Sequence, residues 1–578
     1  MNNTKTNNMK NNNTKTNNMK NKSPKNEKIV EEIETLKKTN ILNTYLGNKG
    51  YSIFKICLND KLIKFIKDEL TVRPFVQNTI VKPNDFPVYQ ESDKKIYVPR
   101  FWGIKYFGEP KEIKISYGKS IDLSFKGELR DYQTNVLNNY LEKINYNEDD
   151  SKNKGDGSAL IELWTGAGKT VLALKILQVL KKKTILFVHK SFLKDQWIER
   201  IEQYLPDAKI GIIQGPIIDI ENKDIVIAMI QSISMKSYPD SLFDDFGLSI
   251  YDECHHISSE IFSNCLRKCT TLYSLGLSAT MNRKDGLTHV FKMYLGDICN
   301  KDSKQEQPKD DVLVKAIDFD VIDDDEYNEI EYDFRGTVKY TTMVSKISNY
   351  SFRSDFIVNV IENELKINKN QQFIVLAQTK NLLNYLFKAI KFKEISSVGY
   401  YVGGMKQHEL KESESKQVIL ATYSMAAEGL DIKSLTTLLL ASPKSDIVQS
   451  VGRILREKHS KPLIIDIIDK HSPFINQFQK RKSFYNQKEY KIIRTNKERY
   501  LNYIKTVNNA IKNNETFEDV LDKSIWNEII PKSKKTNTST INNKKGGNLI
   551  NIDVNTDEHE EYTEDTDLLI EKKFKCLL

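Results

Sequence analysis

The chain has 578 residues, 39% of them hydrophobic and 29% charged, which is enough for several domains of about 100–200 residues each. The formal net charge of +9 permits a nucleic-acid partner, because Lys and Arg release counterions from phosphates, but a lysine-rich surface without such a partner has the same charge. No apolar run of about 18 residues is present, which excludes a membrane-spanning helix. The polar start of the chain argues against a secretory signal.

Residues 1–48 are predicted to be a disordered lead-in. Residues 2–11 read NNTKTNNMKN, and residues 12–21 repeat the same letters. Such a polar segment cannot bury enough apolar surface to offset the entropy lost on ordering. Its lysines could contact nucleic acid, or the segment could be inert.

Residues 49–122 are predicted to form a small strand-rich domain, because β-branched and aromatic residues alternate there. One stretch of it mixes aromatic and basic side chains: Arg100, Phe101, Trp102, Lys105 and Tyr106. This composition suits stacking on nucleic-acid bases, but it equally suits a small hydrophobic core with charges at its edge. Both interpretations stay open on sequence alone.

Two tandem α/β lobes are predicted next, at residues 123–312 and 313–480. Buried parallel strands appear in sequence as continuous apolar runs separated by helical patterns. One series of such runs lies at residues 159–163, 184–188, 224–230, 248–253 and 273–280, and a second at 373–378, 398–403, 418–423, 435–442 and 462–469. Each series predicts a doubly wound parallel sheet. Residues 481–578 are predicted to be a helical extension with a disordered acidic tail.

The six cysteines form no Cys-x-x-Cys pair. Cys265 and Cys269 are four residues apart and lie near His255 and His256, so their residue types alone would allow a zinc site. Reduced thiols in an intracellular protein explain the pattern more simply.

A glycine-rich turn follows the first predicted strand of the first lobe and precedes a helical run. It consists of Thr165, Gly166, Ala167, Gly168, Lys169 and Thr170. Glycines let backbone N–H groups approach a phosphate chain, and the following helix adds its dipole. We expect Lys169 to reach the β- and γ-phosphates and the Thr170 hydroxyl to hold Mg²⁺. One departure is that Leu163 stands where the full pattern has glycine.

Two more short motifs follow apolar strands in the same lobe. Asp252 and Glu253 come after one strand; the first carboxylate can hold Mg²⁺ through its water shell, and the second can polarise an attacking water as general base. Ser278 and Thr280 come after the next strand. Their small hydroxyl groups can hydrogen-bond both the acidic motif and the nucleic-acid side, which would couple hydrolysis to motion.

Paired arginines mark the second lobe. Arg453 and Arg456 are three residues apart, so on a helix they share one face. Two guanidinium groups aimed at a γ-phosphate would stabilise the charge of the transition state. The alternative is a salt-bridged surface helix.

In this order, the motifs resemble those of the superfamily 2 DExH helicases over residues 125–469. The resemblance implies two RecA-like lobes, the cofactors ATP and Mg²⁺, a nucleic-acid partner and ATP hydrolysis. Residues 101–108, 251–256 and 428–457 look most like the transcript-release helicases of poxvirus type in large DNA viruses, which are related to phage recombination and eukaryotic 3′→5′ repair and transcription helicases. That closer resemblance implies a DNA motor of transcription termination or recombination and repair, with transcription machinery as a further partner, in the host cytoplasm or the virion.

The resemblance also assigns roles to further residues. Contacts with the nucleotide are implied for Arg130, Gln133, Gly429 and Asp431. Coupling between the two sites is implied for His255 and Gln449, together with the two hydroxyl residues of the third motif. Contacts with the nucleic acid are implied for Lys190, Ser191, Gln231, Ser232, Gln378, Thr379, Gly403, Lys406 and Thr422.

Of three alternative functions, the sequence leaves one open and argues against the other two. An RNA helicase would carry the same motifs, because both nucleic acids are held through phosphates and only contacts to the 2′-OH discriminate. A non-motor adaptor with an inactive site is disfavoured by the intact Lys169, Glu253 and Arg453. Another enzyme with a phosphate loop, such as a kinase or GTPase, would lack the paired arginines of a second lobe.

Overall fold

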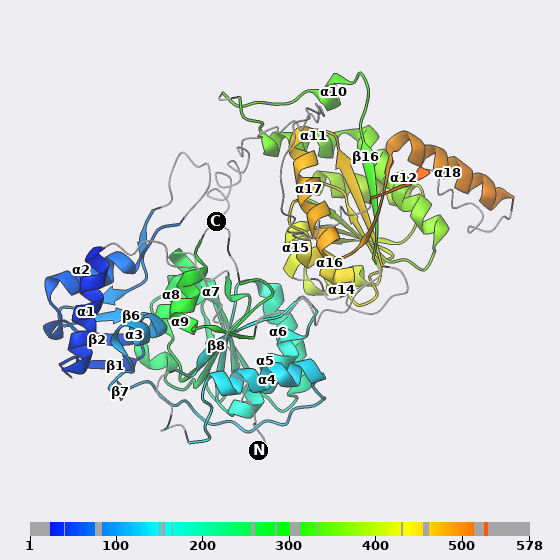
Figure 1. Ribbon diagram of the computed structural model, residues 1–578. Coiled ribbons are helices and arrows are strands. Elements are labelled where there is room, and N and C mark those ends of the chain that lie inside the picture. The colour runs from blue at the N-terminus through cyan, green and yellow to red at the C-terminus, as the bar shows by residue number, and fades with distance from the viewer. Residues whose placement is uncertain are drawn as a thin grey trace, which may run out of the picture.

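The computed structural model describes residues 24–39, 41–74, 84–149, 152, 156–164, 166–255, 260–281, 283, 286–300, 312–334, 336–428, 430, 432–454, 462–513 and 525–529. It has three parts: an N-terminal domain, a first α/β lobe against which that domain packs, and a second α/β lobe (Figure 1). Among the described helices, none combines the length and the apolar composition needed to cross a bilayer.

The N-terminal domain is built on a five-stranded sheet of order β5-β6-β2-β1-β7. Its elements are α1 (Pro24–Lys38), β1 (Thr44–Gly47), β2 (Gly50–Phe54), α2 (Asp60–Glu69), β3 (Thr71–Val72), β4 (Phe86–Pro87), β5 (Gln90–Glu91), β6 (Lys95–Val98), α3 (Arg100–Phe107) and β7 (Glu112–Ile113). Ile33 of α1 and Leu46 of β1 are buried in hydrophobic cores. The structure therefore differs from the predicted disorder up to residue 48, since apolar positions of α1 and β1 pack against the rest of the molecule. Residues 1–23 lie outside the described part of the chain.

The aromatic and basic stretch of this domain is helical rather than extended. In α3, Arg100 is 3% exposed and its guanidinium donates to the backbone oxygens of Thr271 and Leu272, each at 3.1 Å. Trp102 is also buried and packs on Tyr106, with ring centroids 4.6 Å apart. Arg100 and Trp102 thus hold the domain together and against the first lobe, and they form no surface on which a base could stack.

The first lobe has an eight-stranded sheet of order β11-β10-β12-β9-β13-β14-β8-β15, parallel throughout except for β11. Its elements are α4 (Asp131–Lys143), β8 (Ser158–Glu162), α5 (Lys169–Leu180), β9 (Thr184–Val188), α6 (Ser191–Tyr204), β10 (Ile210–Gln214), β11 (Ile217–Asp219), β12 (Ile225–Met229), α7 (Ile230–Met235), β13 (Leu248–Tyr251), α8 (Glu260–Lys268), β14 (Tyr273–Ser278), α9 (Thr288–Leu295) and β15 (Ile298–Asn300). The central strands are buried along their whole length because helices cover both faces of the sheet (Figure 1). Cys265 and Cys269 lie in one of the resulting hydrophobic cores.

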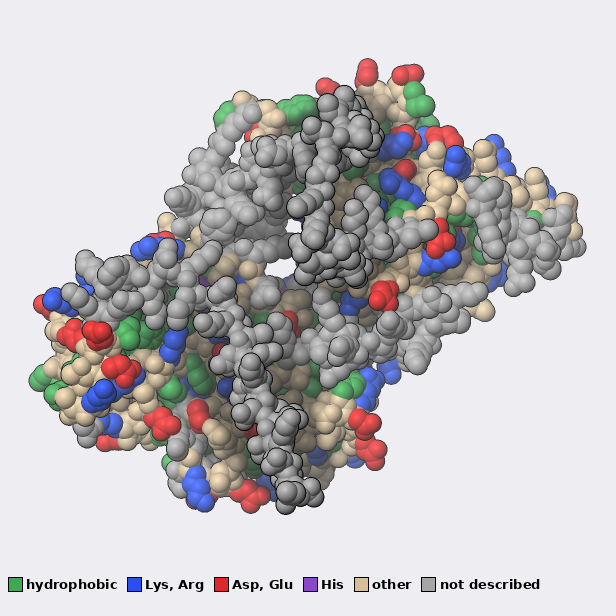
Figure 2. All heavy atoms as spheres, viewed as in Figure 1, with side chains coloured by type: hydrophobic (Ala, Val, Ile, Leu, Met, Phe, Trp, Pro, Cys, Tyr) green, Lys and Arg blue, Asp and Glu red, His purple; other side chains and the backbone are tan. Residues whose placement is uncertain are grey.

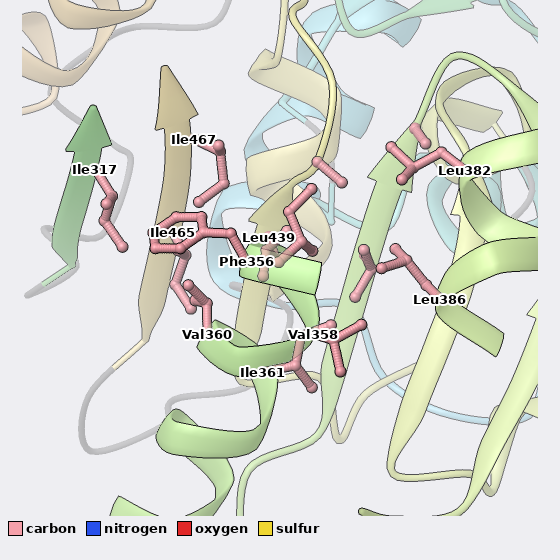
Figure 3. Close-up of a cluster of buried hydrophobic side chains, with 14 of the residues drawn as sticks. Ile317, Phe356, Val358, Val360, Ile361, Leu382, Leu386, Leu439, Ile465 and Ile467 are labelled. Atoms are coloured by element: carbon pink, nitrogen blue, oxygen red, sulfur yellow. The ribbon is translucent and has the colours of Figure 1, made fainter. Parts of the chain in front are cut away.

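The second lobe repeats this architecture with a sheet of order β18-β19-β17-β20-β21-β16-β22-β23. Its elements are β16 (Leu313–Phe319), α10 (Asp325–Asn328), α11 (Tyr340–Asn349), α12 (Ser351–Ile367), β17 (Phe373–Ala377), α13 (Lys380–Phe392), β18 (Val398–Tyr401), α14 (Gln407–Glu414), β19 (Val418–Thr422), α15 (Tyr423–Glu428), β20 (Thr437–Leu440), α16 (Val448–Ile454), β21 (Leu463–Asp469), α17 (Ser472–Gln487), β22 (Lys491–Asn496), α18 (Lys497–Lys512) and β23 (Asn527–Glu528). Successive strand residues point to opposite faces, so Ile465 joins the core with α12 while Ile464 joins the core on the other face. Figure 3 shows Ile465 and Ile467 meeting Phe356 of α12 on the first of these faces.

This sheet extends further along the chain than predicted. Strand β22 pairs in parallel with β16, and β23 pairs with β22. Tyr500 and Val507 of α18 are fully buried in the core of the second lobe. Residues 491–512 are therefore part of the second lobe, where the sequence predicted a separate helical extension. The acidic tail lies outside the described residues.

A buried ion pair ties α12 to the end of β21. Arg353 donates two hydrogen bonds to the Asp469 carboxylate, at 2.6 and 2.8 Å, and both side chains are fully buried. The hydroxyl of Tyr327 donates to the same carboxylate at 2.9 Å. Removing one partner of such a pair leaves an uncompensated buried charge.

Replacing Arg353 with methionine is accordingly expected to lower the free energy of unfolding of the second lobe by about 3–5 kcal/mol. The transition can be followed by urea denaturation. The matched control is Arg499→Met, since Arg499 is exposed on α18. Equal stability of the two variants would contradict a structural role for the buried pair.

Candidate functional site

Three neighbouring strands bring the predicted motifs of the first lobe to one edge. β13, β14 and β8 lie side by side and run parallel. The glycine turn follows β8, Asp252 follows β13, and Ser278 is the last residue of β14. The carboxyl ends of parallel strands meet at the same edge, which is where ligands bind in open α/β sheets.

The glycine turn leads directly into α5. Gly166 and Gly168 have φ of 89° and 75°, a left-handed region that L side chains rarely adopt. A Cβ atom on Gly168 would also lie 2.6 Å from Nε2 of Gln133. Lys169 and Thr170 form the first turn of the helix, so the helix N-terminus faces the turn. Thr165 lies outside the described residues.

Gln133 packs its amide against this turn. Its Nε2 donates to the backbone oxygens of Ala167 and Gly168 at 3.0 and 3.3 Å, and its Oε1 accepts from the backbone N–H of Arg130 at 2.9 Å. Tyr132, which the sequence did not single out, donates its hydroxyl to the same oxygen of Ala167 at 2.7 Å. The Arg130 guanidinium donates to that hydroxyl at 3.2 Å. Residues 130–133 thus contact the turn as a group.

Lys169 faces the acidic pair. Its Nζ lies 3.8 Å from Oε1 of Glu253 and 3.4 Å from the backbone oxygen of Leu163. The Asp252 carboxylate accepts a hydrogen bond from the indole N–H of Trp197 at 2.9 Å. Burial and the neighbouring Glu253 carboxylate raise the pKa of Asp252 to about 6. Trp197 is therefore a positioning residue for Asp252. The local sequence does not predict this contact, because the two residues are 55 positions apart.

Glu253 is joined to the third motif by a polar cluster. Its backbone has a φ of 46°, and this left-handed conformation costs about 1–3 kcal/mol at a non-glycine residue. Its Oε2 lies 3.3 Å from Nδ1 of His255 and 3.4 Å from the Ser278 hydroxyl. Nδ1 of His255 lies 2.8 Å from the Ser278 hydroxyl, and that hydroxyl accepts a hydrogen bond from the backbone N–H of Thr280 at 3.1 Å. The structure therefore brings Glu253, His255, Ser278 and Thr280 together in one polar cluster.

A second group of predicted residues follows the adjacent strands β9 and β12. Lys190 and Ser191 lie at the start of α6, and Gln231 and Ser232 lie at the start of α7. The two segments are linked because Nε2 of Gln231 donates to the backbone oxygen of His189 at 2.6 Å. The hydroxyl of Ser232 accepts from the backbone N–H of Gly215 at 2.8 Å. These four residues share the edge of the sheet that carries the glycine turn.

In the second lobe, the corresponding residues follow the neighbouring strands β17, β18 and β19. Gln378 and Thr379 come after β17, Gly403 and Lys406 after β18, and Thr422 ends β19. The Lys380 ammonium bridges two of these segments by donating to the backbone oxygen of Gly403 at 3.3 Å. The amide of Gln378 donates to the Tyr340 hydroxyl at 3.0 Å. The side-chain oxygen of Thr379 is buried without a described partner.

The predicted arginine helix is α16. Its backbone is described through Ile454, but the side chains of Gln449 and Arg453 are not, and Arg456, Gly429 and Asp431 lie outside the described residues. The loop before α16 is held by Arg481, which is buried and forms a bidentate ion pair with Asp466. Arg481 also donates to the backbone oxygen of Lys444 at 2.6 Å. Arg481 is thus a positioning residue for the segment that leads into α16.

The two lobes touch through α6 and α14. Lys411 of α14 lies 3.6 Å from Glu199 of α6, and Phe192 of α6 packs against the core of the second lobe. A small cavity between the helices is lined by Phe192, Gln196, Glu199, Arg200, Tyr401, Gln407, Lys411 and Glu414. Helix α6 begins at Ser191, and α14 begins directly after Lys406, so two helices that start at predicted nucleic-acid residues form the described contact between lobes.

Comparisons with known proteins agree with this arrangement. Residues 126–283 match the family described as the res subunit of type III restriction enzymes, and residues 356–458 match the helicase conserved C-terminal domain. The helicase L396 of Acanthamoeba polyphaga mimivirus is 34% identical over 466 residues, which is 78% of this chain and 87% of that protein. The DNA 3′–5′ translocase XPB2 of Sulfurisphaera tokodaii is 27% identical over 409 residues, 63% of this chain and 88% of that protein.

Among solved structures, yeast Dbp5 bound to RNA and ADP BeF3 aligns with a TM-score of 0.46 and 14% identity, covering 66% of this chain and 93% of that one. Phage T4 UvsW aligns with a TM-score of 0.30 and 17% identity, covering 79% of this chain and 99% of that one. The sequence relatives, the two family matches and the paired RecA-like sheets lead to one assignment. The chain belongs to the superfamily 2 helicases of large DNA viruses and is a nucleic-acid-dependent ATPase.

Proposed function

We propose that the chain is a DNA helicase or translocase that binds ATP with Mg²⁺ between its lobes and acts in viral transcription termination or in recombination and repair. The observation that supports the motor most strongly is the meeting of three motifs at one sheet edge. Lys169 lies 3.8 Å from Glu253, and Glu253 lies 3.4 Å from Ser278. A lysine after a glycine turn and a carboxylate that can position water are recurring parts of sites that transfer a phosphoryl group to water.

The residues at this edge fit a magnesium nucleotide. Asp252 and Thr170 offer oxygen ligands of the kind that Mg²⁺ prefers, with the ion keeping several waters. Bound there, Mg²⁺ would neutralise charge on the triphosphate. The ammonium of Lys169 would replace its present neighbour Glu253 with the β- and γ-phosphates. Gln133, already against the turn, would hydrogen-bond the adenine edge with support from Arg130.

Glu253 is the proposed general base. A carboxylate within hydrogen-bond reach of a water can align that water for attack and accept its proton. The Glu253 carboxylate contacts His255 and Ser278. Nucleic acid bound on the far side of these two residues would therefore shift the position of the carboxylate. Thr280 and Gln449 would complete this path between the nucleotide and the nucleic acid.

The second lobe would supply the rest of the nucleotide site. Arg453 and Arg456 are proposed to reach the γ-phosphate, Gly429 to contact that phosphate, and Asp431 to bind the ribose. ATP would then bind the closed arrangement more tightly than the open one, because both lobes contact one triphosphate. Hydrolysis would remove this difference in affinity, and the lobes would separate. The contact between α6 and α14 would change at each cycle.

Nucleic acid is proposed to lie across the strand ends of both lobes. Lys190, Ser191 and Thr422 would contact backbone phosphates, as would the other residues grouped at these edges: Gln231, Ser232, Gln378, Thr379, Gly403 and Lys406. Contacts of this kind carry little base information and release counterions, so binding should tolerate any sequence and weaken with salt. The protein would act on nucleic acid in the infected host cell.

DNA is the proposed substrate, with RNA as the second candidate. The name of XPB2 describes a DNA translocase, and the resemblance to transcript-release helicases points the same way. The name of the mimivirus relative, in contrast, describes an RNA helicase. The test compares ATPase stimulation by single-stranded DNA and RNA of the same sequence, followed by strand displacement on 3′- and 5′-tailed duplexes.

We expect DNA to stimulate ATP hydrolysis at least about tenfold more than RNA. If RNA loses one contact that DNA makes, worth about 1.4 kcal/mol, the two nucleic acids differ about tenfold in affinity. Stronger stimulation by RNA would replace the DNA assignment with the second candidate. Absence of stimulation by either would contradict the motor function itself.

A further inference from the structure

An open apolar groove lies in the second lobe where β16 ends, beside α12 and α18. It has a volume of about 350 Å³. Its lining consists of Phe319, Val321, Asp324, Tyr350, Phe352, Asp355, Phe356, Asn359, Lys497 and Leu501. The floor is fixed, because Phe319 and Phe356 are only 1% and 3% exposed and belong to the core. The groove is therefore a built surface feature of β16, α12 and α18.

One of the apolar residues that line this groove is largely exposed. Phe352 is 67% exposed, and Ile322, which follows the lining residue Val321 in the chain, is 79% exposed. Exposed large apolar residues beside an apolar depression mark an interaction site more often than residues scattered singly. Tyr350 is held in place by donating its hydroxyl to Asp324 at 2.5 Å, so the groove does not depend on a ligand for its shape.

The segment beside this groove is acidic. Residues 320–333 contain eight Asp or Glu and no Lys or Arg, although Asp320, Glu329 and Glu331 pair with lysines from elsewhere in the lobe. Asp323, Asp325 and Glu326 are exposed, and among the described residues no ion pair is recorded for these three. Along the edge of the lobe that carries α10, acidic and hydrophobic side chains lie together (Figure 2). The groove thus fits an apolar face flanked by positive charge.

The chain itself contains a segment with this chemistry. Residues 568–578 read LLIEKKFKCLL. With a helical period, Ile570, Phe574, Leu577 and Leu578 fall at i, i+4, i+7 and i+8, which places them on one face. Three lysines, at positions 572, 573 and 575, lie between them. Such a pattern is the one recognised by hydrophobic grooves that bind amphipathic helices.

The segment has enough chain to reach the groove. The last described residue, Ile529, donates its backbone N–H to Ile492 of β22 at 2.9 Å. β22 is the neighbour of β16, whose last residue, Phe319, lines the groove. Residues 530–567 connect Ile529 to the segment, and a flexible chain of that length has a root-mean-square end-to-end distance of about 30–40 Å.

We propose that residues 568–578 dock within the same molecule into the groove of the second lobe, with Ile570, Phe574 and Leu577 on the apolar floor and the lysines toward residues 323–326. The interaction is independent of ATP binding and of the choice between DNA and RNA. It would hold the acidic stretch 557–567 close to the second lobe. The proposal gives a binding site to residues 568–578, which belong to none of the helicase motifs.

Hydrogen exchange of the full chain tests this proposal. The double variant Phe574→Ser, Leu577→Ser is expected to speed amide exchange several-fold at the start of α12 and around α10, to the level of a chain truncated after residue 566. The matched control is Leu568→Ser, which changes the opposite face of the same segment and should leave exchange unchanged. On the groove side, Phe352→Ser should release the segment, whereas Phe392→Ser, at a residue 90% exposed on α13, should not.

Charge reversal provides a second readout. Lys572→Glu with Lys575→Glu should release the segment, and adding Asp323→Lys with Glu326→Lys should restore protection. Identical exchange in wild type and in the Phe574, Leu577 variant would overturn the proposal. Protection that disappears on tenfold dilution would also overturn it, because the segment would then be docking on a second copy.

Discussion

Replacing Lys169 with alanine is expected to reduce the nucleic-acid-stimulated ATPase activity by at least about 100-fold. The ammonium sits at the first position of α5 and 3.8 Å from Glu253. Among the described residues, no other lysine directly follows the glycine turn, so the variant would lose the ammonium proposed to bind the β- and γ-phosphates. Steady-state phosphate release with saturating single-stranded DNA measures the effect.

Lys175→Ala is the matched control for this experiment. Lys175 lies on the same helix, where its ammonium donates to Gln178 at 2.8 Å and has no proposed role in the site. We expect its activity to stay within about twofold of wild type, because such surface contacts contribute little free energy. Turnover near the wild-type rate in Lys169→Ala would contradict the assignment of the glycine turn.

Replacing Glu253 with glutamine is expected to separate nucleotide binding from hydrolysis. The amide keeps the shape of the side chain and can still bond to Ser278, but it cannot accept a proton from water. Loss of general-base catalysis typically lowers a rate by about 10²–10⁴-fold. Affinity for a fluorescent ATP analogue should be retained while single-turnover hydrolysis falls by that factor.

Glu142→Gln, at an exposed residue of α4 in the same lobe, provides the comparison and should hydrolyse ATP normally. A variant at Glu253 that lost binding and hydrolysis in parallel would point to a structural role for the carboxylate. Unchanged hydrolysis would place the general base elsewhere.

The two sheets were predictable because their strands are buried on both faces. Runs such as 185–188 and 373–377 are apolar at every position, and each is fully buried in the structure. The order of motifs after those strands then predicted which side chains meet at the sheet edge. Lys169, Glu253 and Ser278 do meet there.

The N-terminal domain was harder to predict because its local sequence favours the wrong element. The stretch RFWGIKYF is rich in residues with β propensity, yet it forms helix α3. Burial of Trp102 and Phe107 and the glycine at position 108, with a φ of 84°, favour the helix instead. Tertiary contacts decided the outcome here.

Long-range partners were also beyond the reach of local patterns. Trp197 donates to Asp252, and Arg481 fixes the loop before α16. Each acts across many residues of sequence, and neither belongs to a motif with its partner. β22, in contrast, could have been found from the β-branched pair in KIIRTN.

The central claim is that one triphosphate is gripped from both lobes. Fluorescence energy transfer between labels at exposed Asp207 of the first lobe and exposed Lys391 of the second measures the approach of the lobes directly. With single-stranded DNA and a non-hydrolysable ATP analogue, the wild-type chain is predicted to shift to a shorter distance. Arg453→Ala is predicted to bind the analogue on the first lobe but to stay open. Full closure of Arg453→Ala would contradict the account.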